Sequence, residues 1–441
     1  MNPTLQTIYG DQSDMQARRY SNAKEAFAAT YGPGDVLAFR APGRVNLIGE
    51  HTDYNHGFVL PVALDKDTLL LARPRADSTV RLSNLEGEFT PLSFAISSDI
   101  PSAPAGDWGN FARGAAQELT RQLGRDLRGI DGLVVGQSPY GVPRKVGLSS
   151  SSSLTVVVAL ALAHINGWHP ERTELAQLCS EAEWYVGTRG GIMDQFIALL
   201  GQRDHALFLD CRPVADGQYR MGQIPLPKDY SLLIADSGVH HQKVVRGAYN
   251  QRVAACRAGV GLLHPHYPGI THLRDVQNVP WAEIAEWLPE ETTVREISEQ
   301  GIDLGDVPGL TSDTSLEVRA RCRHVWTENQ RVEAAVTALA AGDVATLGRL
   351  LNEAHASARD DYEISCPELD VLVNAACEVD GVAGARLTGA GLGGCVVAVV
   401  HQDAVSDFEA HVSKRFQAEL GRETTIFACQ SGPGAGECRF D

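Results

Sequence analysis

Short apolar runs, separated by turn-rich segments, predict that this chain mixes helices and strands. Strands are expected where β-branched and aromatic residues crowd or alternate with polar ones. These segments are residues 36–41, 58–64, 67–73, 79–82, 230–235 and 394–400. Helices are expected where apolar residues recur every three to four positions, as in 110–123, 154–165, 173–186, 316–341, 344–356 and 368–377. Because strands and helices do not alternate strictly, the pattern favours an α+β fold over a parallel α/β sheet.

One break in the pattern divides the chain. Residues 211–217 follow an apolar run and are rich in the residue types of turns. At roughly 150 residues per domain, two large or three small domains are expected. We therefore predict an N-terminal domain over residues 1–212 and a C-terminal domain over 213–441. Residues 269–315, rich in proline, glycine and acidic side chains, are predicted only as an insertion or connection.

Composition and charge narrow the classes of function. The chain of 441 residues is 44% hydrophobic and 21% charged, which is typical of a globular protein. Its formal charge of −17 repels nucleic acid and anionic membrane surfaces. The longest apolar run, 154–165, falls short of the ~20 residues that span a bilayer, and the first residues lack the pattern of a secretory signal. Nine cysteines without a C-x-x-C pair indicate neither a disulfide framework nor a zinc site. We expect a cytoplasmic protein without a nucleic-acid or membrane partner.

The first stretch with candidate chemistry is RAPGRVNLIGEHTDYN, residues 40–55, directly after an expected strand. Its carboxylates can accept paired hydrogen bonds from neighbouring hydroxyls, and Arg44 can steady developing negative charge. The stretch therefore suits a polyhydroxylated ligand. A solvated polar turn is the alternative interpretation.

A second stretch, PRKVGLSSSSS at residues 143–153, opens an apolar helix. Small residues at a helix start leave backbone N–H groups free for phosphate, and serine hydroxyls add donors or a Mg²⁺ ligand. A serine-rich helix cap is the alternative, although five consecutive serines exceed what a cap requires. Since no Walker A sequence is present, any phosphate site belongs to a fold other than the P-loop.

Two further stretches combine glycines with polar residues. In residues 181–196, glycines precede Asp194, and Glu183 on the preceding helix could reach a metal ion; either acid could instead lie on the surface. Residues 386–395 contain G-x-G-x-x-G, but a strand-like run follows where the dinucleotide fingerprint needs a helix. We therefore expect a phosphate or substrate wall, or a plain tight turn, rather than a Rossmann site.

The order of the stretches at 40–55, 143–153 and 386–395 resembles that of the three motifs of the GHMP small-molecule kinases. Within that superfamily, residues 43–55 resemble the galactokinase signature, which mevalonate and homoserine kinases lack. Similarity to galactokinases continues at 193–195, 249–252 and 359–370 and so spans nearly the whole chain.

This resemblance implies a fold and a reaction. The N-terminal domain would be like domain 2 of ribosomal protein S5, the C-terminal domain ferredoxin-like, and the active site would lie between them. ATP would donate its γ-phosphoryl group to the anomeric hydroxyl of galactose, with Mg²⁺ present. The protein would be a monomer or a weak homodimer.

The resemblance also implies roles for individual residues. Asp194 would be the general base and Arg44 its charge-stabilising partner. The sugar contacts would be Arg44, Glu50, His51, Asp53, Asp194 and Tyr249. The ATP contacts would be Trp108 beside the base and Gly147, Leu148, Ser149, Ser150, Ser151 and Ser152 along the triphosphate. The Mg²⁺ ligands would be Ser151 and Glu183.

The chain departs from the family pattern at three places. Lys145 stands where a glycine is usual and Ser152 where an alanine is usual, which bears on nucleotide affinity. Residues 187–191 look more like the loop of N-acetylgalactosamine kinases, which bears on the sugar. N-Acetylgalactosamine, arabinose or a uronic acid are therefore alternative substrates, and a non-catalytic galactose and ATP sensor is an alternative function. Asp194, Arg44 and the serine run are all retained, so the sequence favours an enzyme that prefers galactose with some tolerance at carbon 2.

Overall fold

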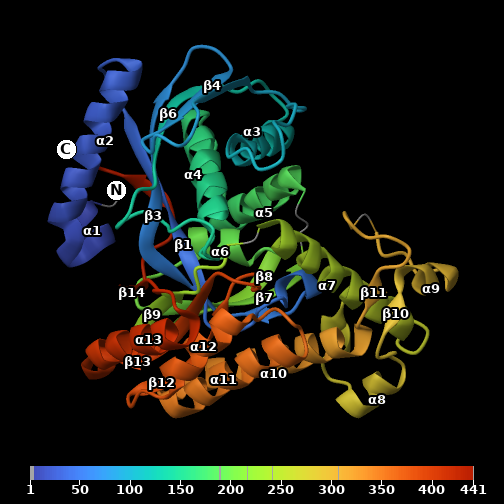
Figure 1. Cartoon of the computed structure of the whole chain (residues 1–441). Helices are drawn as coiled ribbons and strands as arrows, with labels where there is room; N and C mark the ends of the chain where they lie inside the picture. Colours follow the sequence, from blue (N-terminus) through green and yellow to red (C-terminus); the bar gives the residue numbers. More distant parts are fainter. Residues whose placement is uncertain (1–3, 188–189, 216, 241, 306, 441) are drawn as a thin grey trace.

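The computed structural model describes residues 4–187, 190–215, 217–240, 242–305 and 307–440. Two sheets, each covered by helices, lie one above the other in Figure 1. Among the described residues, no helix is long and apolar enough to cross a membrane.

The upper sheet has six strands in the order β15-β1-β3-β6-β4-β5. They are β1 (Leu37–Asn46), β3 (Pro61–Pro74), β4 (Thr79–Asn84), β5 (Leu92–Ala95), β6 (Ile130–Val135) and β15 (Gly436–Cys438). Neighbours are antiparallel except β4 and β6, which run parallel. The C-terminal strand β15 pairs with β1, so the end of the chain completes the sheet formed by its first half.

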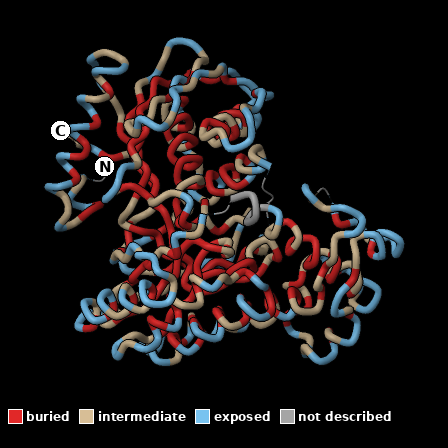
Figure 2. Tube along the Cα trace, in the orientation of Figure 1, coloured by how far each residue is buried: buried red, intermediate tan, exposed pale blue. Residues whose placement is uncertain are grey.

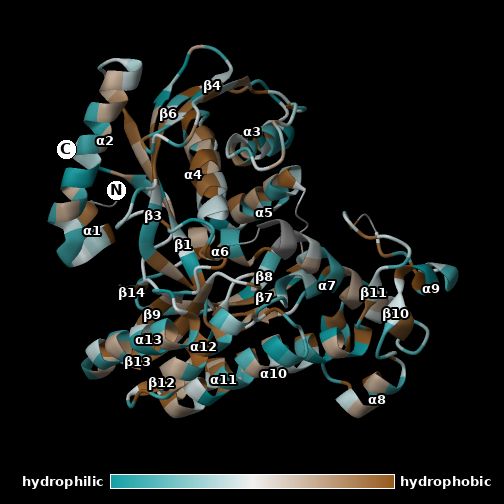
Figure 3. Ribbon diagram, in the orientation of Figure 1, coloured by the Kyte–Doolittle hydropathy of each residue, from teal (hydrophilic) through white to brown (hydrophobic). Residues whose placement is uncertain are grey.

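Both faces of this sheet are covered because β3 is apolar on both sides. Leu70 belongs to the core formed with α3 (Gly109–Leu123), α4 (Ser150–Ile165), α5 (Arg172–Ala182) and α6 (Met193–Leu200). Leu69 and Leu71 face the other way and pack with α1 (Leu5–Tyr9) and α2 (Ser13–Tyr31). This alternation follows from the two-residue period of a strand. Helix α4 is apolar over most of its surface and buried along most of its length (Figures 2 and 3).

The lower sheet has the antiparallel order β12-β13-β9-β14. Its strands are β9 (Tyr230–Asp236), β12 (Val382–Thr388), β13 (Cys395–His401) and β14 (Ile426–Cys429). Alternate residues of β13 pack with α12 (Pro367–Cys377) and α13 (Val405–Leu420) on one face and with α11 (Val344–Asp360) on the other. The second of these cores also contains Val45 and Val62 of the upper sheet, so one apolar core joins the two parts.

The remaining elements connect and flank the two sheets. The strands β2 (Phe58–Val59), β7 (His205–Ala215) and β8 (Gln218–Pro225) form a third sheet in the order β2-β7-β8. Helices α7 (Gln242–Leu263) and α10 (Val318–Ala341) lie beside it (Figure 1). Residues 269–315 form small elements only, namely η4 (Leu273–Val276), α8 (Trp281–Glu286), β10 (Thr292–Thr293) and α9 (Val294–Glu299), and β11 (Ser315–Leu316) pairs with β10.

Most of the elements expected from the pattern are present, with some corrections. The expected strands 58–64 and 67–73 are wrong as separate units, because Leu60 interrupts pairing and β3 continues from residue 61 to 74. The expected helix 173–186 ends at Ala182, and residues 183–186 form the 3₁₀ turn η3 (Glu183–Val186). The turn expected over 211–217 is wrong for its first half, because β7 continues to Ala215 through pairing with β8. Residue 216 lies outside the described residues, and a domain division after residue 212 stays a prediction.

Candidate active site

The centre of the candidate site is an ion pair between Arg44 and Asp194, which are 150 positions apart in the sequence. Arg44 lies near the end of β1 and Asp194 in the first turn of α6. The guanidinium donates from Nε to Oδ1 at 2.8 Å and from Nη2 to Oδ2 at 3.0 Å, the bidentate geometry that fixes a carboxylate most firmly. The side chain of Arg44 is 8% exposed and that of Asp194 is 23% exposed, so the carboxylate is the more accessible member of the pair. A direct sugar contact by Arg44 stays a prediction.

The same arginine connects Asp194 to the serine loop, residues 147–153. Its Nη1 donates to the carbonyl of Gly147 at 2.6 Å. Ser149 donates to Oδ2 of Asp194, and Ser152 lies 3.5 Å from the same oxygen. Arg44 therefore sets the separation between the carboxylate and the loop expected to hold phosphate.

Strained backbone shapes the serine loop. Gly147 has φ +82° and Ser149 has φ +58°, both in the left-handed region. At Ser149 this conformation turns the chain into α4, whose first backbone N–H groups lack partners within the helix. Such a helix start is a site where anions bind.

A second loop lies against the serine loop. Residues 389–394, the glycine loop, join the antiparallel strands β12 and β13, so no helix follows the G-x-G-x-x-G and the rejection of a Rossmann site is confirmed. A Cβ on Gly147 would lie 3.2 Å from the carbonyl oxygen of Thr388, and one on Gly389 would lie 2.8 Å from that of Gly147. The two loops can approach this closely only because both positions are glycine.

Glu183 is a buried carboxylate near Asp194. Burial, and secondarily Asp194, raise its pKa to about 7, although the side chains of Ser152, Gln195 and Thr155 favour the charged form. Its Oε1 is buried without a hydrogen-bond partner. An orphaned buried carboxylate oxygen beside serine hydroxyls fits the hard oxygen ligands that Mg²⁺ prefers. Among the described residues, no group of three or more His, Cys, Asp or Glu side chains is placed to hold a metal ion.

Asp53 and Tyr249 also lie close enough to Asp194 for its charge to act on both. Asp53 is in the polar loop, residues 47–57, and Tyr249 is on α7. Burial, and secondly the nearby charge of Asp194, raise the pKa of Asp53 to about 6. Burial also raises the pKa of Tyr249, with Asp53 and Asp194 as the next causes, so the phenol remains a hydrogen-bond donor. Carboxylate acceptors and a phenolic donor around one space suit adjacent sugar hydroxyls.

His51 is a neutral member of this cluster. Burial lowers its pKa to about 3. Its Nε2 lies 3.2 Å from the carbonyl of Ala390, which can only accept, so the proton is on Nε2 and Nδ1 accepts from the Tyr54 hydroxyl at 2.8 Å. The ring centroid lies 5.4 Å from that of Tyr249. His51 thus connects the polar loop to the glycine loop.

The side chain of Glu50 is held in place by hydrogen bonds to other groups of the protein. Its Oε2 accepts from Asn46 at 2.8 Å and its Oε1 from the backbone of Gly389 at 2.8 Å. The residue is only 1% exposed. In this structure Glu50 joins the polar loop to the glycine loop, and a direct sugar contact stays a prediction.

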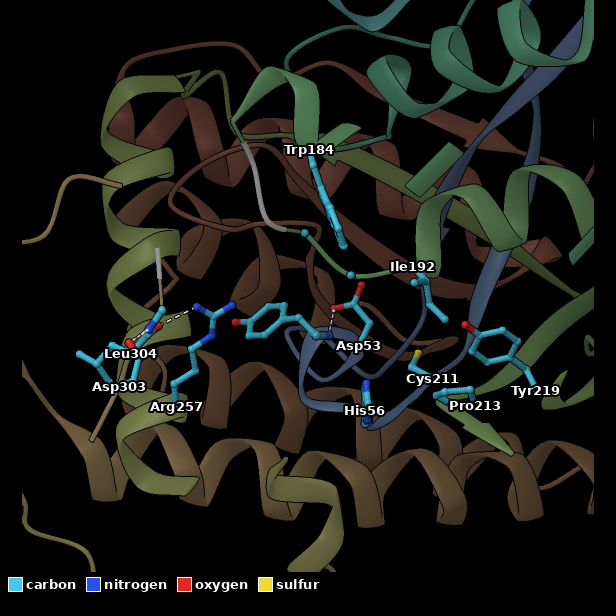
Figure 4. A pocket seen from close by; sticks show the side chains of 14 residues that line it. Asp53, His56, Trp184, Ile192, Cys211, Pro213, Tyr219, Arg257, Asp303 and Leu304 are labelled. Atoms are coloured by element: carbon cyan, nitrogen blue, oxygen red, sulfur yellow. Dashed lines mark hydrogen bonds between the residues drawn. The ribbon is translucent and has the colours of Figure 1, made fainter. Parts of the chain in front are cut away.

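A cavity of about 650 Å³ opens beside Asp53. Figure 4 shows Trp184 pointing into it from above, Ile192 and Tyr219 on one side, and Arg257 on the other. Arg257 donates from Nη1 to the carbonyl of Leu304 at 2.7 Å, so the insertion 269–315 contributes a wall. The volume lies in the range of small-molecule sites.

Several expected contacts lie outside this centre. Trp108, at the start of α3, donates to the carbonyl of Thr90 at 3.1 Å and packs edge-on against Phe89. Phe89 in turn carries the Arg144 guanidinium 4.5 Å from its ring centroid, which places Trp108 near the start of the serine loop. Lys145 is exposed with φ +64°, the conformation that explains why glycine is usual there. A role for Trp108 beside a nucleotide base stays a prediction.

Family models match three segments of the chain: the galactokinase galactose-binding signature over residues 25–74, the GHMP kinases N terminal domain over 110–202 and the GHMP kinases C terminal over 335–418. The galactokinase of Roseiflexus sp. (strain RS-1) is 42% identical over 414 residues, which cover 94% of this chain and 96% of that protein. The chain belongs to the galactokinase family. The resemblance read from the three motifs is thereby confirmed.

Other relatives agree at the level of sequence and of fold. The galactokinase of Halalkalibacterium halodurans is 36% identical over 91% of this chain and 93% of its own length. The crystal structure of Lactococcus lactis galactokinase complexed with galactose matches with a TM-score of 0.78 at 31% identity, covering 95% of this chain and 99% of that one. The mevalonate kinase of Methanococcus jannaschii, at 17% identity and a TM-score of 0.57, shares the fold. The expected two-part GHMP kinase fold of the α+β class is confirmed.

The galactokinase motifs thus lie together at one site. One of the three places where the chain departs from the family pattern, the loop 187–191, is only partly described by the structure. Thr188 and Arg189, in the loop that looked like that of N-acetylgalactosamine kinases, lie outside the described residues. The hydroxyl of Ser152, which stands where alanine is usual in the family, is one of three groups that favour the charged form of Glu183. The carbonyl of Ser151 accepts from the Thr155 hydroxyl, and a role of Ser151 as a metal ligand stays a prediction.

The sequence did not reveal the residues, distant along the chain, that hold the loops of this site in place. Thr388 accepts from the backbone of Asn46 at 3.0 Å, and Glu328 and His324 of α10 contact the polar loop. The available signal was an excess of polar residues on the buried face of the helix expected at 316–341, where His324, Glu328 and Asn329 are all fully buried. Buried polar side chains of this kind normally have specific partners.

Proposed function

We propose that this protein is a galactokinase, which transfers the γ-phosphoryl group of ATP to the anomeric 1-hydroxyl of galactose. The observation that carries the proposal is the bidentate pair of Arg44 and Asp194, which contacts the serine loop through the Gly147 carbonyl and lies close to Asp53 and Tyr249. Relatives named galactokinase that cover nearly the whole chain, and a related structure complexed with galactose, support the same reaction.

The arrangement explains how these residues would act. Phosphoryl transfer depends chiefly on positioning the two substrates and on neutralising charge on the transferred group. Arg44 holds Asp194 and the Gly147 carbonyl together, so the hydroxyl acceptor and the phosphate loop keep a fixed separation. Asp194 would orient the hydroxyl first and accept its proton late in the transfer.

A Mg²⁺ ion would be held by Glu183 and Ser151 at the start of α4. When bound, it would neutralise charge on the phosphate oxygens. The orphaned Oε1 of Glu183 supports this part of the proposal.

Replacing Glu183 with glutamine tests the metal site. The variant is expected to raise the Mg²⁺ concentration for half-maximal rate by more than about tenfold, because an amide is a poorer ligand than a carboxylate. Binding of Mn²⁺ in the presence of ADP, followed by electron paramagnetic resonance, should weaken in parallel. Glu181→Gln, at an exposed position two residues earlier, is the matched control. Unchanged Mn²⁺ affinity in Glu183→Gln would remove Glu183 from the metal site.

The choice of sugar is tested by ATP consumption with galactose, N-acetylgalactosamine, galactosamine, arabinose, galacturonate and glucuronate. We expect galactose to have the highest kcat/KM. A pocket closed around a hydroxyl cannot admit an acetamido group without strain, whereas the roomy space beside Asp53 leaves some tolerance. N-Acetylgalactosamine is therefore expected at least about tenfold lower but measurable. A higher value for N-acetylgalactosamine would reassign the substrate, and no turnover with any sugar despite retained ATP binding would favour a sensor.

The proposal includes the setting in which the enzyme works. We propose a cytoplasmic monomer or weak homodimer with a domain division near residue 212. The charge of −17 argues against nucleic-acid and anionic membrane partners, and the nine cysteines are all free, as expected in a reducing compartment.

A further inference from the structure

Helix α10 contacts the polar loop through a buried carboxylate that belongs to none of the sequence motifs. Glu328 is fully buried, and its Oε1 accepts from the backbone N–H groups of Gly49 at 2.8 Å and Glu50 at 3.3 Å. These amides lie directly before His51 and close to Asp53, on the loop that provides the sugar contacts in the proposed function.

The turn at Gly49 explains why its amide needs this partner. Gly49 has φ +101°, and a Cβ there would lie 2.5 Å from the carbonyl oxygen of Phe58. The backbone is therefore folded tightly against the start of β2, and the N–H of Gly49 donates to Glu328. A buried N–H group without an acceptor destabilises the folded state, and the carboxylate of Glu328 provides that acceptor for Gly49.

Two neighbours on α10 hold the same loop. His324, one turn earlier, places Nε2 3.1 Å from the carbonyl of Glu50. Asn329 accepts from the backbone of Phe58 at 2.9 Å, at the far end of the loop. The backbone is thus held before and after the residues that face the sugar.

The charge of Glu328 is balanced on its other side. Arg331 donates from Nε to Oε2 at 2.7 Å, and Arg386 Nη2 lies 3.7 Å from Oε1. Burial alone would raise the pKa of Glu328, but Arg331 and Arg386 lower it to about 2. Oε2 therefore accepts from Arg331, whereas Oε1 accepts from the loop amides and lies near Arg386.

We propose that Glu328 is a positioning residue for the sugar, because its carboxylate fixes the backbone of Gly49 and Glu50 and thereby sets where Glu50, His51 and Asp53 lie. This inference rests on the proposed function for the identity of the sugar. The backbone contact itself stands independently of it.

The test compares Glu328→Gln with Arg331→Gln. Glutamine at 328 cannot face both Arg331 and the loop amides with acceptors, so one side meets its N–H₂ group. We expect the KM for galactose to rise at least about tenfold, with the KM for ATP within about twofold of the wild type. Hydrogen–deuterium exchange of peptides that include Gly49 and Glu50 should become faster. Arg331→Gln removes one of the two counter-ions and leaves the Oε1 contacts with the loop in place, so it should lower the melting temperature without changing the galactose KM or this exchange.

Three further arms make the outcome decisive. Glu333→Gln, on an exposed position of the same helix, is the surface control. If Glu328→Gln does not fold, Glu328→Asp keeps the charge toward Arg331 but shortens the reach by one methylene, and the same changes in KM and exchange are expected. If the wild type does not phosphorylate galactose, the proposed function fails and the exchange measurement alone decides the role of Glu328. An unchanged galactose KM and unchanged exchange in a folded Glu328 variant would overturn the proposal.

Discussion

Replacing Asp194 with alanine is expected to lower turnover by a factor of ~10² to 10⁴, the range for loss of a positioned acid or base. The structure gives the reason, because both oxygens of this carboxylate are oriented by Arg44 and it is the exposed member of the pair. The measurement is kcat with saturating galactose and ATP. Circular dichroism and the melting temperature serve to show that the variant is folded. Turnover near that of the wild type in a folded variant would remove Asp194 from the reaction.

Asp194→Asn separates the two ways in which Asp194 could act. The amide oxygen can still accept from Arg44 and orient a hydroxyl, but it cannot take the proton. If orientation dominates, the asparagine variant should retain at least about tenfold more activity than the alanine variant. If proton transfer dominates, both should lose the same amount.

The motifs could be read from the sequence because each is local. Arg44, Gly147 and Asp194 lie in short stretches whose residue types already indicate their chemistry, and the family resemblance assigned their roles. The family resemblance implied that Arg44 and Asp194 lie together, but their contact across 150 positions of sequence is seen only in the folded structure. Strands such as β1 and β13 were equally readable, because their apolar residues crowd within a few positions.

Other features depend on contacts that no local pattern contains. A run of five serines marks a helix start, but only the left-handed backbone of Ser149 decides that Ser149 and Ser152 face Asp194. Residues 316–341 read as an ordinary helix, and the partner of Glu328 is a backbone amide 279 positions away. Likewise, β15 is three residues long and becomes a strand because β1 offers it an edge.

The serine loop provides the second large effect, since its tight backbone leaves no room for a side chain at Gly147. Valine there would have to adopt φ near +82° and would place its Cβ 3.2 Å from the carbonyl oxygen of Thr388. Left-handed strain costs about 1–2 kcal/mol and crowding about 1–3 kcal/mol, so the loop should move away from the glycine loop.

Because the N–H groups at the start of α4 bind phosphate by close approach rather than by charge, Gly147→Val should weaken ATP binding on the order of 10²-fold or more. Galactose binding should change far less, because Asp53, His51 and Tyr249 belong to the polar loop and α7 and not to the serine loop. Calorimetry with each ligand measures both affinities.

Gly124→Val is the matched control, since Gly124 has φ +58° with nothing within 4 Å of a Cβ. This variant carries the backbone strain without the crowding. Equal losses of affinity for ATP and galactose in Gly147→Val would indicate general misfolding. A weakened ATP affinity in Gly124→Val would show that backbone strain at a distant position is sufficient to weaken ATP binding.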